Sequence, residues 1–261
     1  DRGRIAEQEG DLKGAIEFYR RAVDVIEQQR STINTETSKI GFVGDKQAVY
    51  RQLIAALLLD HQDAAAFEYV ERSKSRALVD MLAAKQDFAV NTGNPSKVRE
   101  LLAMATDAES EARIQEGGTE KSRTRSIVME ARQQLRTESP QLASLVSVSS
   151  LDASDIQSLL PPDEALVEYY FNAPELVAFV VSSAEITAVR LDGTDLVECV
   201  REFRKQLENT ESANYQALAR QLHERLLKPL ADRIGDRKLL VVAHGPLHYL
   251  PFTALHDGQA Y

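Results

Sequence analysis

Cysteine, glycine and proline are scarce in this chain of 261 residues, and tryptophan is absent. The single cysteine, Cys199, has no partner for an internal disulfide and belongs to no ligand cluster of the kind that holds structural zinc. With only 12 Gly and 8 Pro, the composition excludes collagen-like and disordered proteins. We therefore expect a folded protein of a reducing, cytoplasmic compartment.

Long apolar runs and an excess of positive charge are also missing. The apolar runs of the chain, such as 239–243, are far shorter than the roughly 18 residues that a membrane span needs. Residues 1–10 are charged, so we expect no signal peptide. Lys and Arg number 31 against 40 Asp and Glu, a net charge of -9, which disfavours binding to phosphate backbones. Neither a membrane nor a nucleic acid is an expected partner.

Apolar residues recur at intervals of three and four between residue 5 and about residue 84, a spacing typical of helices with one buried face. The connection at 60–63 is so short that the helices on either side are expected to form an antiparallel hairpin. The three stripes are Leu12, Ile16, Tyr19, Val23 and Ile26; Tyr50, Leu53, Ile54, Leu57 and Leu58; and Phe67, Val70, Ala77, Leu78, Met81 and Leu82.

Residues 10–22 have the pattern of small and large residues of a tetratricopeptide (TPR) second helix, in which Ala15 allows close approach and Tyr19 fills the gap beside it. Residues 63–76 resemble a second, looser copy. Two helix pairs are fewer than the three or so repeats that such arrays need to stand alone. We interpret 1–92 as a TPR-like segment that binds a protein or peptide partner and needs a further element to cover its open face.

The next region, 93–150, combines balanced charge with a narrow apolar stripe, interrupted by Gly117 and Gly118. This pattern predicts a solvated helical hairpin that turns at the glycine pair and links two domains. One alternative stays open. Lys121, Arg123 and Arg125 would then form a docking site for an acidic partner.

From residue 151 the apolar period changes. Three short runs, 165–171, 176–181 and 186–191, are rich in β-branched and aromatic residues and predict an antiparallel meander of strands. After two helical patterns, 238–243 is a continuous apolar run, typical of a strand buried on both faces by helices. The predicted fold class is α plus α/β.

Familiar catalytic motifs are missing from the chain: it has no phosphate loop, no G-x-S-x-G elbow and no H-E-x-x-H pair. Cys199 follows Leu196 by one helical turn and is expected to lie in the core as a small apolar group. It is therefore not a candidate nucleophile.

Histidines gather near the end of the chain. His244 and His248 are four residues apart, but Gly245 and Pro246 between them make a helix unfavourable, and His256 lies further on. We therefore predict no metal site there. For His244 two interpretations remain: a structural residue that caps the loop, or a functional group at the carboxyl end of a strand, where α/β sites form.

The segment 245–255 carries too many large apolar groups for a solvated loop. Pro246 must end the preceding strand because it has no amide hydrogen for a ladder. We expect the segment to turn back and pack on the sheet as an ordered clamp, with the Phe252 ring buried. The apolar groups are Leu247, Leu250, Phe252 and Leu255.

Residues 238–255, KLLVVAHGPLHYLPFTAL, resemble the strand and loop near the middle of CHAT domains, caspase-like peptidase-fold domains found behind TPR repeats. Residues 69–82 resemble the last repeat helix before such domains, and 159–169 resemble their opening. The order of these stretches is that of the family. The resemblance implies that 151–261 is the incomplete, N-terminal part of a CHAT domain.

In this family the catalytic histidine follows a later strand and the nucleophilic cysteine follows the next one, so the resemblance implies that both come after Tyr261. It transfers no catalytic role to His244 or Cys199. We therefore expect no catalytic, cofactor-binding or metal-binding residue in the chain. The favoured interpretation is the N-terminal fragment of a TPR-CHAT cysteine endopeptidase, and the alternative is a non-enzymatic TPR scaffold for protein interactions.

Overall fold

The computed structural model describes residues 2–32, 36–84, 152–208 and 215–258, together with isolated helical positions between 97 and 137. Within these residues, only the backbone is described for 27–46 and 75–84. The chain divides into two compact units, Asp1–Leu151 and Asp152–Tyr261. Among the described helices, none has the length and apolar character that crossing a membrane requires.

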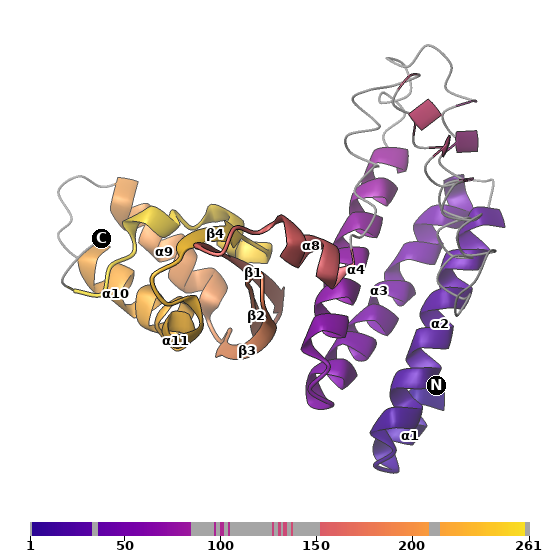
Figure 1. Cartoon of the computed structure of the whole chain (residues 1–261), viewed down its shortest axis with the longest axis horizontal. Helices are drawn as coiled ribbons and strands as arrows, with labels where there is room; N and C mark the ends of the chain where they lie inside the picture. The colour runs from indigo at the N-terminus through magenta and orange to yellow at the C-terminus, as the bar shows by residue number, and fades with distance from the viewer. Residues whose placement is uncertain are drawn as a thin grey trace. The chain divides into compact units, whose positions relative to one another are not determined.

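The first unit begins with four helices, and each packs against the next along the chain (Figure 1). This confirms the helices predicted from the apolar spacing. They are α1 (Arg2–Gln8), α2 (Leu12–Thr32), α3 (Glu36–Leu59) and α4 (Asp63–Ala84).

Small and large side chains alternate where α1 meets α2. A Cβ atom added to Gly3 would lie 2.4 Å from the ring of Tyr19, so only glycine lets the two helices approach this closely. The Tyr19 hydroxyl donates a hydrogen bond to Glu7 Oε2 at 2.9 Å. Burial is the main cause that raises the pKa of Tyr19, and the Glu7 carboxylate adds to it. Tyr19 thus fills the gap that the sequence pattern predicted beside Ala15, which is itself buried.

The pair α3 and α4 has a fully buried contact face. Arg20 of α2 donates to Gln62 in the short α3–α4 connection at 3.0 Å, and Arg72 of α4 pairs with Asp24 of α2 at 3.7 Å. These contacts tie the second helix pair to α2. The buried face consists of Leu53, Ile54, Ala56, Leu57, Ala66, Phe67 and Val70.

Only isolated positions of the predicted hairpin 93–150 are described, and all of them are helical. Leu101 and Ala131 are buried, as the apolar stripe predicted, whereas Met104 and Ile127 are exposed. The glycine pair and the basic residues Lys121, Arg123 and Arg125 lie outside the described residues. The hairpin and its acidic partner therefore stay predictions.

The second unit contains a four-stranded mixed sheet in the order β3-β2-β1-β4. Strands β1 (Glu164–Asn172), β2 (Glu175–Val181) and β3 (Ile186–Asp192) form an antiparallel meander, and β4 (Lys238–Val242) runs parallel to β1. The meander and the mixed α and β class are as predicted. The helical elements are α8 (Ala153–Leu159), α9 (Leu196–Glu208), α10 (Tyr215–Leu226), η2 (Lys228–Leu230), α11 (Ala231–Ile234), η3 (Gly245–Tyr249) and η4 (Phe252–Ala254).

The core of the second unit lies between one face of the sheet and the helices α9 and α10. Alternate residues of each strand point into it because side chains in a strand alternate between the two faces. Tyr169 lies at its centre and donates a hydrogen bond from its hydroxyl to the backbone oxygen of Leu226, at 2.9 Å. The buried members are Val167, Tyr169, Leu176, Ala178, Val180, Leu196, Val200, Phe203, Ala219, Leu222, Leu226, Leu230, Leu247, Leu250 and Leu255.

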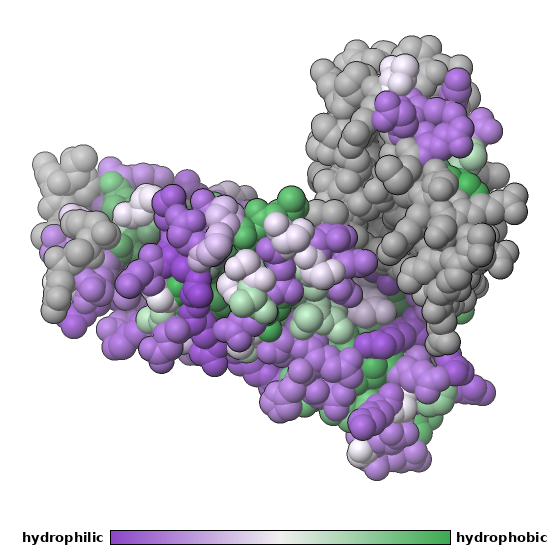
Figure 2. Space-filling view, viewed as in Figure 1, coloured by the Kyte–Doolittle hydropathy of each residue, from purple (hydrophilic) through white to green (hydrophobic). Residues whose placement is uncertain are grey.

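Strand β4 departs from its prediction. It was expected to be buried on both faces, but it forms an edge of the described sheet, and Leu239, Leu240 and Val242 are 36%, 43% and 38% exposed. The prediction is wrong because composition does not distinguish an apolar strand at the edge of a sheet from one in its interior. Figure 2 shows apolar side chains, in green, that interrupt a mostly hydrophilic surface.

The segment 245–255 is an ordered clamp, as predicted. It forms two short 3-10 turns, η3 and η4, and its residues Leu247, Leu250 and Leu255 are buried in the core. The Phe252 ring packs against the core, but it is less buried than expected. It lies in the single turn η4 at the surface, where its ring stacks on Tyr169 with centroids 5.6 Å apart and stays half-buried.

Candidate functional site

The carboxyl ends of the parallel strands β1 and β4 meet at one edge of the sheet, the place where α/β proteins bind ligands. His244 follows β4 there. Its Nδ1 accepts a hydrogen bond from the backbone N–H of Phe171, at 3.0 Å, and its ring stacks on Tyr170 with centroids 5.5 Å apart. His244 therefore links the end of β4 to the end of β1.

The hydrogen bond defines the protonation of the imidazole. A nitrogen that accepts a hydrogen bond carries no proton, so the proton of His244 lies on Nε2. These contacts support the interpretation of His244 as a structural residue of the loop. A role as general base would require the acceptor nitrogen to face a substrate, whereas Nδ1 faces the backbone of β1.

Gly245 is needed where it stands. Its φ of 59° lies in the left-handed region, and an added Cβ would lie 2.9 Å from Cδ1 of Phe171. An L-residue at this position would combine backbone strain with a clash. The chain can thus turn away from β4 only because this residue has no side chain.

The other two histidines do not join His244 in a cluster. His248 is exposed, and the His256 Nδ1 accepts the backbone N–H of Gly258 at 3.0 Å. Across the part of the chain that the structure describes, no three His, Cys, Asp or Glu side chains are grouped so that they could hold a metal ion. The absence of a metal site from this loop stays a prediction.

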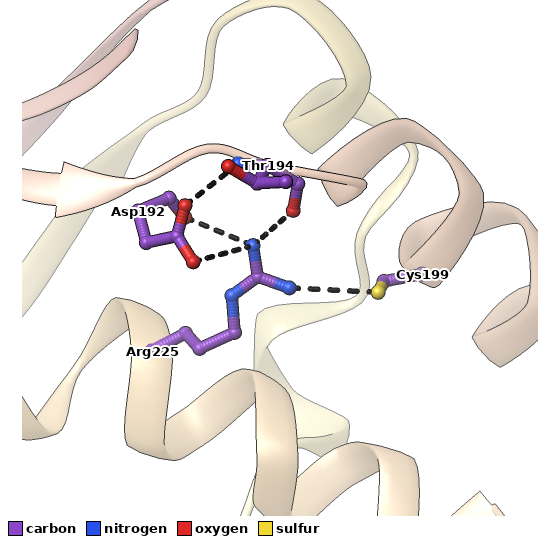
Figure 3. A network of polar contacts seen from close by, with 4 residues as sticks. All are labelled: Asp192, Thr194, Cys199 and Arg225. Atoms are coloured by element: carbon purple, nitrogen blue, oxygen red, sulfur yellow. Dashed lines mark hydrogen bonds and ion pairs between the residues drawn. The ribbon is translucent and has the colours of Figure 1, made fainter. Parts of the chain in front are cut away.

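Cys199 packs against the core of the second unit, as predicted, but it is only half-buried. The Nη1 of Arg225 lies 3.5 Å from Sγ and donates to it, as Figure 3 shows. Among the described residues, no general base bonds to the thiol, so the arrangement lacks the base of a cysteine nucleophile.

Arg225 holds together the link between β3 and α9 (Figure 3). Its Nη2 donates to the backbone oxygens of Asp192, at 3.0 Å, and Thr194, and lies 3.9 Å from the Asp192 carboxylate. The hydrogen bond from the Thr194 N–H, at 2.9 Å, is the main cause that lowers the pKa of Asp192, and Arg225 contributes a smaller part. This network fastens α10 to the end of the meander.

A groove of about 550 Å³ lies between α9 and η3. The guanidinium of Arg204 lies over the ring of Tyr249, 5.3 Å from its centroid. The sequence analysis did not single out this site. The signal that was present is the group of basic residues in α9, which follow one another at helical spacing. The groove is lined by Val197, Val200, Arg201, Arg204, Lys205, Glu208, Gly245, Pro246 and Tyr249.

Comparison with known proteins adds no relative. A scan against models of protein families and a search of curated proteins each found no match to this chain.

Proposed function

We propose that this chain is the N-terminal part of a cytoplasmic TPR-CHAT cysteine endopeptidase. The helices α1 to α4 bind a protein or peptide, and the sheet is the leading half of the caspase-like domain that carries the catalytic dyad. Three resembling stretches in the family's order support this assignment, together with the open sheet edge described next.

The observation that carries the proposal is the state of β4. Successive side chains of β4 point to opposite faces of the sheet, so Leu239 and Leu240 lie on different faces. Each of these two residues is more than one third exposed. An apolar edge strand of this kind templates pairing with another strand. A further strand beside β4, with helices over it, would cover these groups and produce the doubly covered strand that the composition of β4 indicates.

The helical unit supports the binding role. Gly3 and Ala15 let helices approach, and Tyr19 fills the gap between them. Stacked helix pairs of this kind present extended surfaces to peptides. Four described helices, from α1 to α4, supply two such pairs.

The chemistry of the complete enzyme follows from the resemblance. A histidine activates a cysteine thiolate, which attacks the peptide carbonyl, and the same histidine protonates the leaving amine. Cys199 takes no part in this chemistry because, among the described residues, no general base contacts its thiol. His244 takes no part because its Nδ1 accepts from the backbone. Both groups of the dyad therefore belong to strands that follow β4 in the complete protein.

The test is amide hydrogen exchange in β4, measured in this chain and in a longer chain that includes the residues encoded after Tyr261. The N–H groups of β4 that point away from β1 should exchange freely here and become protected in the longer chain. Equal exchange in the two proteins would contradict the proposal.

A second candidate is a non-enzymatic scaffold that uses the helices to bind a partner. In its favour, no general base contacts the thiol of Cys199, the one cysteine of the sequence, among the residues that the structure describes. The coding sequence separates the two. A strand ending in His-Gly, followed by a strand ending in Cys, supports the peptidase, and a stop codon after Tyr261 supports the scaffold.

A further inference from the structure

The groove between α9 and η3 differs in charge from the rest of the molecule. The chain as a whole carries a net charge of -9, yet three basic side chains and one acidic side chain line this groove. The basic groups come from a single face of α9, and η3 supplies the opposite wall. All of the lining residues belong to the second unit.

The basic groups are available to an external anion. Arg201 pairs with Glu198, and Arg204 lies 3.8 Å from Glu208, but all four side chains are well exposed. Exposed ion pairs along a helix are worth less than about 1 kcal/mol, so an incoming carboxylate competes with them readily. Within the described residues, Lys205 has no ion-pair partner.

The groove also exposes apolar surface. Val197 is 45% exposed and Tyr249 is 64% exposed, and Val200 and Pro246 also line the groove. Exposed apolar groups that are rimmed by charge mark binding sites. Because the Arg204 guanidinium lies over the Tyr249 ring, the basic and the apolar parts of the groove are adjacent.

We propose that the α9–η3 groove binds an acidic peptide segment of a partner protein. Carboxylates of the peptide contact Arg201, Arg204 and Lys205, and one of its apolar side chains packs between Val197 and Tyr249. The occupant is a peptide because the groove, at about 550 Å³, is larger than a lone phosphate or carboxylate needs and offers apolar walls that such an ion cannot use. The site is independent of the peptidase assignment and of the helices α1 to α4.

The charge of the groove is the reason why we expect the bound peptide to be acidic. A basic strip on a protein of net charge -9 attracts anionic partners locally, while the remaining surface repels them. An acidic peptide would therefore bind in the basic groove and not on the remaining acidic surface.

Fluorescence anisotropy tests the proposal with the full chain. The probe is a fluorescein-labelled peptide of sequence Glu-Glu-Phe-Glu-Glu-Leu-Glu-Glu, and the matched peptide carries Gln at every Glu. We expect the acidic probe to bind, with an affinity that falls as NaCl is raised. The double variant Arg204→Glu, Lys205→Glu should weaken binding by about tenfold or more.

The control is the double variant Lys13→Glu, Arg233→Glu, which makes the same change in net charge at two exposed positions outside the groove. It should bind within about twofold of the wild type. Circular dichroism and melting of both variants show that each is folded. Tyr249→Ala, which leaves every charge in place, should also weaken binding and tests the apolar wall separately.

Four outcomes would overturn the proposal. The Gln peptide binds as tightly as the acidic one, or the two double variants weaken binding equally. Inorganic phosphate displaces the probe at concentrations similar to the peptide's own Kd, which would make the groove a site for small anions. Alternatively, the chain self-associates in sedimentation and the groove variant abolishes this, which would make the occupant a second copy.

Discussion

Tyr169 shows how one polar atom is accommodated in the core of the sheet. Its ring is buried under α10, and its hydroxyl reaches the last backbone oxygen of that helix, on Leu226. A helix leaves its final carbonyls without partners within the helix. The hydroxyl therefore satisfies an acceptor that would otherwise be buried unpaired, and it also fixes the end of α10 against β1.

Tyr169→Phe should lower the free energy of unfolding by about 1 to 2 kcal/mol, because the carbonyl of Leu226 loses its partner. Burial raises the pKa of Tyr169, so the folded protein keeps a proton that the unfolded chain loses above about pH 10. The stability that the hydroxyl contributes is thus complete below that pH and declines above it. Urea melts of the two proteins at neutral and alkaline pH measure this. A difference that grows with pH would contradict the account.

Gly245→Ala tests the turn after β4. The substitution places a Cβ on a residue with φ of 59° and against the ring of Phe171. We expect a loss of about 1 to 3 kcal/mol in thermal or chemical unfolding. Gly10→Ala is the matched control, since its φ is also positive, at 80°, but nothing lies within 4 Å of the added atom. Equal losses in the two variants would show that strain alone, without the clash, determines the cost.

Cys199→Ala should leave the protein folded and cost at most about 1 kcal/mol, because the thiol is half-buried and its bond to Arg225 is weak. Arg225→Ala should cost more, about 1.5 to 3 kcal/mol, since it removes charge-assisted bonds to Asp192 and Thr194. Parallel urea melts give both values. The reverse order would mean that the thiol, and not the guanidinium, holds α9 to α10.

At the scale of elements, the clamp 245–255 stabilises the sheet through a few buried anchors. Leu247 is fully buried, so Leu247→Ala should cost about 2 to 5 kcal/mol. Tyr249→Ala, two residues along the same turn, should be nearly neutral for stability because the ring is mostly exposed. Thermal melts compare the two variants, and equal melting temperatures would show that the clamp does not pack on the core in solution.

The elements that the sequence predicted well are those with a strong local period. The helices α2 to α4 repeat their apolar residues every three or four positions, and the three meander strands are separated by clear turns. The environment of β4 was not predictable from its composition, because exposure of an apolar strand depends on which strand pairs with it next. Packing at this level is a property of the sheet and not of the segment.

The candidate site was also predicted only in part from the sequence. The irregular loop around His244 was predicted from Gly245 and Pro246, and its carboxyl-edge position from the order of strands. The hydrogen bond from Phe171 to His244 joins residues far apart in the chain, and no local pattern encodes it. The basic face of α9 was missed because charges at helical spacing on an exposed helix are usually only solvated; η3 turns this face into a groove.

At the scale of the whole molecule, the two units suggest a division of labour. The four described helices pack closely at Gly3 and Tyr19 and belong to the unit that we propose binds a partner, and the second unit has a sheet with one open, apolar edge at β4. A peptidase built on this plan would couple partner binding to a catalytic half mounted on β4. Within the residues that the structure describes, no general base contacts the thiol of Cys199.

Peptide cleavage by a longer chain tests this account most directly. The protein that continues past Tyr261 is incubated with a fluorogenic peptide library, beside the chain of 261 residues. We predict that the longer protein cleaves, that replacing the cysteine of its downstream strand by alanine abolishes cleavage, and that Cys199→Ala leaves cleavage unchanged. Cleavage by the shorter chain, lost in Cys199→Ala, would contradict the account, as would a folded longer protein that cleaves no peptide.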